Sequence, residues 1–138
     1  MNNNKKIALI TGAGSGIGKE MALQLALKDV HVLLLGRKLE KLEKVEKQIY
    51  DKNGSSTIVK LNLENFNEID VLGYEMFKKF KKLDFLILNA GILGTLGPLV
   101  HQNVEEFEKV INTNLVANFR LIRSLDLLLR KSKMPKIL

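Results

Sequence analysis

Residues 11–18 read TGAGSGIG, a turn with glycines at positions 12, 14, 16 and 18. The apolar run 7–10 precedes this turn, and the helix-like segment KEMALQLALK follows it. Glycine allows a tight exit from a strand and a close approach of the backbone to another group, because it has no Cβ. A helix that begins here would direct free N–H groups and the positive end of its dipole at the turn. The spacing therefore predicts a site for phosphate groups.

Two phosphate-binding patterns compete for this turn. A nucleoside triphosphate loop, GxxxxGK[ST], would align on Gly18-Lys19 but would need glycine at 13 and a hydroxyl residue at 20. The chain has Ala13 and Glu20, so the hydroxyl that binds magnesium is missing, and an ATPase or GTPase is disfavoured. The pattern GxxxGxG fits. It predicts that a pyrophosphate is held by the turn and by N–H groups at the start of the helix, with these residues in the site: Gly12, Ser15, Gly16, Ile17 and Gly18.

An alternation of strands and helices must position this turn. Nearly unbroken apolar runs predict buried parallel strands at residues 6–11, 30–35, 57–61 and 83–88. Helical spacing predicts helices at 17–28, from 39 to a stop at Asn53-Gly54, at 66–80, and from a cap at Asn103 to about 131. The expected fold is α/β, a Rossmann-like doubly wound parallel sheet of four strands in the order 3-2-1-4 with flanking helices. In such a sheet the ligand lies beyond the carboxyl ends of the strands, where the strand order reverses.

Length and composition limit the classes of partner. The chain has 138 residues, of which 46% are hydrophobic, and it fits one globular domain, residues 1–138. Without cysteine it has no disulfide or thiolate zinc site, and no metal-ligand spacing is present. The net charge of +7 lies mostly on lysines of helix faces, without the pattern of a nucleic-acid reader, so we expect an anionic small ligand and no nucleic acid. No leader peptide or membrane span is evident, which predicts a cytoplasmic protein.

Four stretches together resemble the short-chain dehydrogenase/reductase family. Thr11-Gly12-x-x-x-Gly16-Ile17-Gly18 is similar to the cofactor fingerprint of the family, and Asn89-Ala90-Gly91 is similar to the motif that supports the sheet beside the cofactor. Asn114 matches an asparagine of the family's catalytic tetrad. Asn62 stands where the family usually has an aspartate that contacts the adenine amine, and an amide oxygen can still accept that hydrogen bond. The resemblance covers essentially the whole chain and implies an NAD(P)-dependent oxidoreductase acting on a carbonyl or alcohol.

The type of cofactor follows from the end of the second predicted strand. Sites for NAD usually carry an acidic residue there, about 20 residues after the glycines, which binds the ribose 2′-hydroxyl. This chain has Gly36-Arg37-Lys38, and no carboxylate lies between Asp29 and Glu40. Arg37 can bind a 2′-phosphate through two N–H groups and stack on the adenine, so we predict NADP(H) in preference to NAD(H). In the alternative, Arg37 is a surface residue at the start of a helix.

Asn114 also has a local argument. Helical spacing places it on one broad apolar face, together with Phe107, Val110, Ile111, Asn118, Leu121, Leu125 and Leu128. An amide inside an apolar stripe must find hydrogen-bond partners. It can satisfy a buried backbone carbonyl and a water, which is a structural role, or it can act in the proton relay that the resemblance implies. The two roles overlap, because the asparagine of the family works by holding a water.

The remaining catalytic residues implied by the resemblance, a serine and a Tyr-x-x-x-Lys pair, are not found in the expected places. Tyr74 and Lys78 have the right spacing but precede the Asn-Ala-Gly strand, so helical spacing alone explains them. Ser124 and Ser132 belong to the fourth predicted helix or its end. His31, expected at the surface where its strand starts, and His101, expected in a loop, offer no replacement. The chain thus resembles the amino-terminal part of such an enzyme, is expected to be inactive by itself, and reveals no particular substrate.

Two further expectations concern the end of the chain. Residues 135–138 resemble the start of a fifth strand, and without that strand residues 83–88 would form a bare apolar sheet edge. An incomplete domain of this kind is expected to self-associate. Two alternatives to the dehydrogenase function are a non-catalytic protein that binds a dinucleotide for regulation or assembly and a basic scaffold for nucleic acid.

Overall fold

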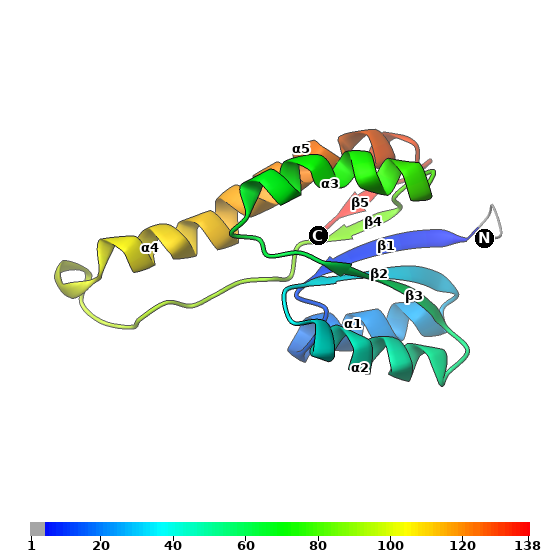
Figure 1. Cartoon of the computed structure of the whole chain (residues 1–138), viewed down its shortest axis with the longest axis horizontal. Coiled ribbons are helices and arrows are strands. Elements are labelled where there is room, and N and C mark those ends of the chain that lie inside the picture. The colour runs from blue at the N-terminus through cyan, green and yellow to red at the C-terminus, as the bar shows by residue number, and fades with distance from the viewer. Residues whose placement is uncertain (1–4) are drawn as a thin grey trace.

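The computed structural model describes residues 5–138, which form a parallel sheet between two layers of helices (Figure 1). The elements follow in the order β1 (Lys6–Thr11), α1 (Gly16–Leu27), β2 (Val30–Gly36), α2 (Leu39–Tyr50), β3 (Ser55–Lys60), α3 (Phe66–Lys79), β4 (Phe85–Ile87), the 3₁₀ turn η1 (Leu99–His101), α4 (Val104–Ile111), the π-helical turn η2 (Asn112–Val116), α5 (Ala117–Arg130) and β5 (Lys136–Ile137). The strands lie in the order β3-β2-β1-β4-β5. This confirms the predicted doubly wound α/β fold, with the strand order reversing between β1 and β4.

The expected start of a fifth strand at residues 135–138 is confirmed, so the sheet has five strands where four were predicted, and β4 does not form the bare edge expected without that strand. The two residues of β5 extend the sheet, because Phe85 pairs with Lys136 and Leu86 with Ile137. The Leu138 N–H donates to the Leu86 carbonyl at 3.0 Å, and the Leu88 N–H donates to the Leu138 carbonyl at 2.8 Å. The last residues of the described chain therefore satisfy backbone groups that β4 would otherwise expose.

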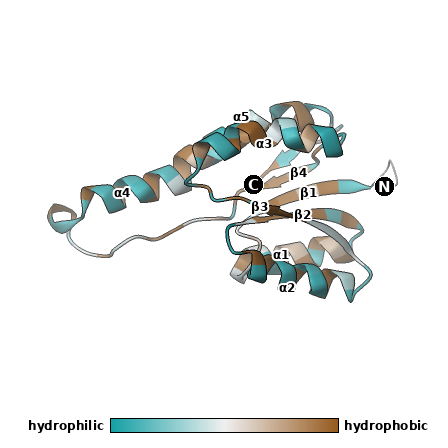
Figure 2. Cartoon of the chain, in the orientation of Figure 1, coloured by the Kyte–Doolittle hydropathy of each residue, from teal (hydrophilic) through white to brown (hydrophobic). Residues whose placement is uncertain are grey.

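Alternation along the strands divides the apolar side chains between two cores. Leu9 and Leu33 point to the core that includes α3 and α5, whereas Ile10 and Leu34 point to the core that includes α1 and α2. Successive side chains of a strand face opposite sides, so strands that are apolar at almost every position can serve both cores. Figure 2 shows the hydrophobic colouring of β1 and β2 between the two helical layers. The predicted burial on both faces is confirmed for β1 and β2, whereas no residue of β3 is fully buried.

The helices α3 and α5 approach each other closely at Gly73. A Cβ on this residue would lie 1.7 Å from the Ser124 carbonyl oxygen, so no larger residue fits without separating the helices. The Ser124 hydroxyl accepts a hydrogen bond from the Gly73 N–H at 2.9 Å and donates to the Asp70 carbonyl at 3.3 Å. Glycine in a helix usually costs stability, and here it allows α5 to lie against α3.

The fourth predicted helix, residues 103–131, is divided in the structure. Asn103 caps α4 by accepting a hydrogen bond from the Glu106 N–H at 2.9 Å, as its position predicted. The chain then passes through η2 into α5. A π-helical turn contains more residues than an α-helical turn and shifts the face that later residues present. Leu121, Leu125 and Leu128 are buried on the sheet, whereas Phe107 and Ile111 are exposed.

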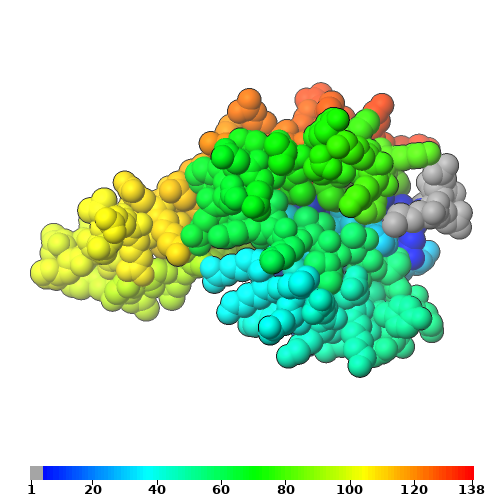
Figure 3. All heavy atoms as spheres, viewed as in Figure 1, coloured from blue at the N-terminus to red at the C-terminus, as the bar shows by residue number. Residues whose placement is uncertain are grey.

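Figure 3 shows residues of α4 and of the preceding segment projecting from the body of the molecule. None of the eight residues of α4 is buried. A segment that crosses a bilayer as a helix would need about 20 apolar residues, and none of the helices within residues 5–138 meets this requirement.

Candidate functional site

The carboxyl ends of β1 and β4 are joined by hydrogen bonds at the point where the strand order reverses. The buried Thr11 ends β1, and its hydroxyl accepts a hydrogen bond from the Ala90 N–H at 2.9 Å. Asn89, which follows β4, donates from Nδ2 to the Thr11 carbonyl at 3.0 Å. These contacts hold the glycine turn and the Asn-Ala-Gly segment side by side. Ligands of open α/β sheets bind at such a position.

The glycine turn depends on its glycines for different reasons. Gly12 has φ of +67° and Gly16 has φ of +57°, both in the left-handed region where a side chain is strained. A Cβ on Gly18 would lie 2.6 Å from the Gly12 carbonyl oxygen and 2.5 Å from Asn89 Nδ2. The absence of a side chain at 18 therefore allows α1 to begin directly against the turn and against Asn89.

The first turn of α1 is free to receive an anion. Ser15 stands at the N-cap position, yet its side chain makes no capping hydrogen bond, and no acidic residue lies in the first turn. The first N–H groups of a helix have no acceptor within the helix. Together with the positive end of the helix dipole, they form a favourable place for a phosphate. A Cβ on Gly16 would meet nothing within 4 Å, so the space beside this turn is open.

A cleft of about 340 Å³ runs along the carboxyl ends of the strands, a volume typical of small-molecule sites. Most of the residues predicted for the site line it, namely Gly12, Ser15, Arg37, Asn62, Asn89, Ala90 and Gly91. Gly16, Ile17, Gly18 and Asn114 do not line the cleft, although the first three form the start of α1 at its rim. Residues from four separate stretches thus meet at one edge of the sheet.

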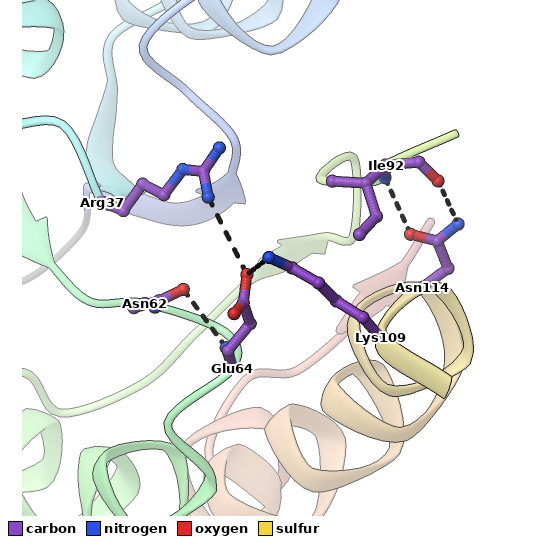
Figure 4. A network of polar contacts seen from close by, with 6 residues as sticks. All are labelled: Arg37, Asn62, Glu64, Ile92, Lys109 and Asn114. Carbon is purple, nitrogen blue, oxygen red and sulfur yellow. Dashed lines mark hydrogen bonds and ion pairs between the residues drawn. The ribbon is translucent and has the colours of Figure 1, made fainter. Parts of the chain in front are cut away.

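The end of the cleft beyond β2 and β3 is rich in charge. Arg37, Lys38 and Lys41 follow β2 and line this end. Asn62 follows β3, and its Oδ1 accepts a hydrogen bond from the Glu64 N–H at 3.3 Å. The Glu64 carboxylate lies 3.8 Å from Arg37 Nη1 and 3.4 Å from Lys109 Nζ of α4 (Figure 4). Neither Glu64 nor Lys109 was singled out in the sequence, because nothing local indicates that α4 reaches this loop.

Thr113 also lines the cleft, and no pattern in the sequence predicted this. Its side chain is 6% exposed, and its hydroxyl has no hydrogen-bond partner among the described residues. Buried polar groups almost always have a partner, so this enclosed hydroxyl is an exception beside the cleft. The free start of α1 and the cations beyond β2 together fit an anionic ligand that carries phosphate groups.

Asn114 joins the helical segment to the strand edge. Its Nδ2 donates to the Ile92 carbonyl at 2.9 Å, and its Oδ1 accepts from the Ile92 N–H at 2.9 Å (Figure 4). The Asn114 carbonyl accepts from Asn118 Nδ2 at 2.8 Å. The prediction that Asn114 lies within an apolar stripe is wrong, because this residue is exposed in the structure. Its amide satisfies a backbone carbonyl, as the structural role predicted, and leaves one N–H for a further partner.

The other groups considered in the sequence lie away from the cleft. Tyr74 is 69% exposed on α3, with Lys78 Nζ 4.1 Å from the centre of its ring. His101 is exposed in η1. The prediction that His31 lies at the surface is wrong: it is 5% exposed, because strand pairing places it beside β3, where Ser55 and Thr57 hydroxyls contact its ring nitrogens at 3.0 Å. Burial, and secondarily the charge of Lys5, lowers the pKa of His31.

The fold is of the doubly wound α/β class, with its cleft at the switch point of the sheet. Within residues 5–138, no three histidine, aspartate or glutamate side chains converge as a metal site. The family model described as short chain dehydrogenase matches residues 6–137. The chain therefore belongs to the short-chain dehydrogenase family.

Individual relatives agree with this assignment. The chain is 36% identical over 127 residues to the fatty acyl-CoA reductase of Acinetobacter baylyi, which covers 90% of this chain and 42% of the relative. The oxidoreductase yciK of Escherichia coli is 33% identical with a TM-score of 0.92 over 97% of this chain and 56% of that one. A metagenomic short-chain oxidoreductase in complex with NADP is 29% identical with a TM-score of 0.90, over 96% and 60%. The chain spans about half the length of the relatives it matches.

Proposed function

We propose that this chain is the NADP(H)-binding portion of an oxidoreductase that transfers hydride between a nicotinamide and a carbonyl or alcohol. The observation that carries the proposal is the single cleft at the β1–β4 switch point, which joins the glycine turn, the Asn-Ala-Gly segment and the cationic loop after β2. Family membership and a structural neighbour in complex with NADP support it.

The residues present have separate roles in this proposal. The glycine turn and the start of α1 would hold the pyrophosphate, Arg37 the 2′-phosphate, and Asn62 the adenine edge. When bound, the cofactor supplies the hydride or accepts it. The part of Asn114 is to hold the Ile92 backbone beside the cleft and to offer its remaining N–H to a water.

Preference for NADP(H) over NAD(H) rests on the charges beyond β2. Arg37 is followed by Lys38, and Lys41 lines the same end of the cleft, so a 2′-phosphate would meet three cations. Direct titration at modest salt is expected to show NADPH bound at least about tenfold more tightly than NADH. Arg37→Ala should remove most of this difference, whereas Arg123→Ala, an exposed cation of α5, should leave it unchanged. Equal affinities of the wild-type chain for the two cofactors would contradict the preference.

We also propose that residues 1–138 by themselves bind cofactor without turning over substrate. The Tyr74 and Lys78 pair lies on the exposed face of α3, where it cannot act on a group in the cleft. Oxidation of NADPH with a panel of ketones and aldehydes is expected to stay at the background rate. A rate above background that Tyr74→Phe leaves unchanged would show that another proton donor is present.

Self-association is proposed through the outer face of α4, η2 and α5, with a second copy of this chain as the partner. Large apolar side chains follow one another along this face and are exposed: Phe107, Ile111, Leu115, Phe119 and Ile122. Glu108 lies toward one end of the stripe and Arg123 toward the other, so two copies in antiparallel orientation would pair opposite charges. Light scattering of the wild-type chain should show a dimer or a larger species. Phe119→Asp should convert this species to monomer, whereas Tyr50→Asp, an exposed position of α2, should leave it unchanged. A monodisperse wild-type monomer would contradict it.

A further inference from the structure

Glu64 introduces a negative charge into an otherwise cationic end of the cleft. The described residues that line the cleft include three cations and a single carboxylate, that of Glu64. In Figure 4 this carboxylate lies between Arg37, which follows β2, and Lys109, which comes from α4. The residue proposed to bind the 2′-phosphate is thus already next to an anion of the same chain.

The contact between Arg37 and Glu64 is loose. Their nearest atoms are 3.8 Å apart, beyond hydrogen-bond distance, and the Arg37 side chain is 58% exposed. Exposed ion pairs of this kind contribute little and exchange partners readily. A phosphate carries more charge than a carboxylate and can accept two N–H bonds from one guanidinium, so it competes well for Arg37.

Lys109 gives the carboxylate a second partner. It is 3.4 Å from Glu64 Oε1 and is half exposed, so the pair can tighten when Arg37 turns away. Lys109 also belongs to α4, which has no buried residue. A change in the partner of the Glu64 carboxylate would therefore alter a contact of α4, the helix that projects from the body.

We propose that Glu64 is a specificity-determining residue, an internal anion that holds Arg37 until a 2′-phosphate displaces it. The displaced carboxylate then stays with Lys109. This inference rests on the proposed binding of NADP(H). A ligand without a 2′-phosphate does not displace Glu64, so the residue acts only on the phosphorylated cofactor: it weakens that binding by a competition that Lys109 partly relieves.

Calorimetric titration with 2′-phospho-ADP-ribose and with ADP-ribose tests the exchange, because both probes fill the adenosine end and lack the nicotinamide. Glu64→Gln is expected to bind the phosphorylated probe about two- to fivefold more tightly and ADP-ribose as before. The effect should shrink in high salt, since exposed charges are screened. Glu75→Gln is the matched control: it removes one carboxylate from exposed α3, where Glu75 pairs with Lys78, and should change neither affinity.

Lys109→Met examines the second partner. Without Lys109 the carboxylate stays with Arg37, so affinity for the phosphorylated probe should fall about twofold, and in the Glu64→Gln background the same change should have no effect. Circular dichroism melting of each variant verifies that it is folded.

Each other result overturns the proposal in a recognisable way. An equal loss of affinity for both probes in Glu64→Gln would mean that the carboxylate contacts the adenosine itself. An equal gain in affinity for the phosphorylated probe in Glu64→Gln and Glu75→Gln would mean that only net charge matters. No change in affinity in either variant would mean that Glu64 does not restrain Arg37. If the wild-type chain bound neither probe, the proposed cofactor site would fail and this inference with it; if it bound the phosphorylated probe more tightly and Glu64→Gln changed nothing, only the inference would fail.

Discussion

Helices α4 and α5 are consecutive parts of one helical stretch, joined by η2, and they lie in opposite environments. Five residues of α5 are buried, and they come from the leucine-rich face that packs on the sheet and on α3. In α4 no residue is buried, although its apolar and polar residues are also segregated. Amphipathic patterning therefore predicts that a helix has a face to cover, and it does not say whether the same chain covers it.

The difference arises from what each helix meets. Gly73 and Ser124 let α5 lie against α3 at backbone distance. The contacts of α4 are made at its edges, through Glu106, which accepts a hydrogen bond from the Thr95 hydroxyl at 2.6 Å, and through Lys109 at Glu64. A surface held by a few polar contacts is available to a partner, whereas a packed apolar surface is not.

The largest expected effect is at the closest contact of the packed helix. Gly73→Ala places a Cβ within 1.7 Å of the Ser124 carbonyl oxygen, which neither backbone can avoid without moving apart. We expect the free energy of unfolding to fall by about 4 kcal/mol or more. Chemical denaturation measures it. Gly97→Ala, whose Cβ would be 3.5 Å from Gln102 Nε2, should cost little; similar losses in the two variants would show that α3 and α5 are not tightly packed.

The same leucine-to-alanine substitution in α5 and in the exposed segment compares the stability that each contributes. Leu125 is fully buried in α5, and Leu115 is 63% exposed in η2. Leu125→Ala leaves a cavity and is expected to cost about 3 kcal/mol, whereas Leu115→Ala should cost less than about 0.5 kcal/mol in the monomer. Denaturation at low protein concentration checks this. A large loss at Leu115 that grows with protein concentration would instead show that a second copy covers it.

The carboxyl end of α5 is anchored by Asp84, and this anchor depends on pH. Burial opposes the charge of Asp84, but hydrogen bonds from Ser132, the Ile7 N–H and Lys82 outweigh it and lower the pKa of this carboxyl. Because the folded-state pKa lies below the unfolded value, the stabilisation is complete above the unfolded pKa and is lost as pH falls through the folded one. Asp84→Asn should cost about 2 kcal/mol at pH 7 and flatten the acid limb of the stability profile. If the low-pH part of the stability profile were unchanged in Asp84→Asn, other carboxyl groups would be responsible for the acid sensitivity.

A smaller and local effect is expected where the exposed segment is tied to the loop after β4. Asn114→Ala removes both hydrogen bonds to Ile92, which lie at the surface, and should cost about 1 kcal/mol. The loss should be local, so hydrogen exchange at the Ile92 amide should speed up while exchange in β1 stays slow. Faster exchange throughout the sheet would mean that Asn114 supports the whole fold. Asn118→Ala, which removes only the bond to the Asn114 carbonyl, is the comparison.

Much of the fold and of the site could be predicted from local patterns. The apolar runs located β1 and β2, and the glycine spacing located the turn at the edge of the sheet. The Asn-Ala-Gly segment was identified by its resemblance to the family, and it lies beside Thr11. What was missed depends on distant segments. Glu64 and Thr113 reach the cleft because loops and helices far apart in sequence meet there, and His31 is buried because β3 pairs beside it.

The sequence by itself indicated the main strands, the place of the glycine turn and the charges that follow β2, because these properties are set by short-range periodicity and by the conformational freedom of glycine. Only the tertiary structure decided that the two residues of β5 are enough to pair with β4, that Gly73 brings α5 against α3, and that α4 is left exposed. Burial depends on what packs against a face, and a one-dimensional pattern does not contain the partner.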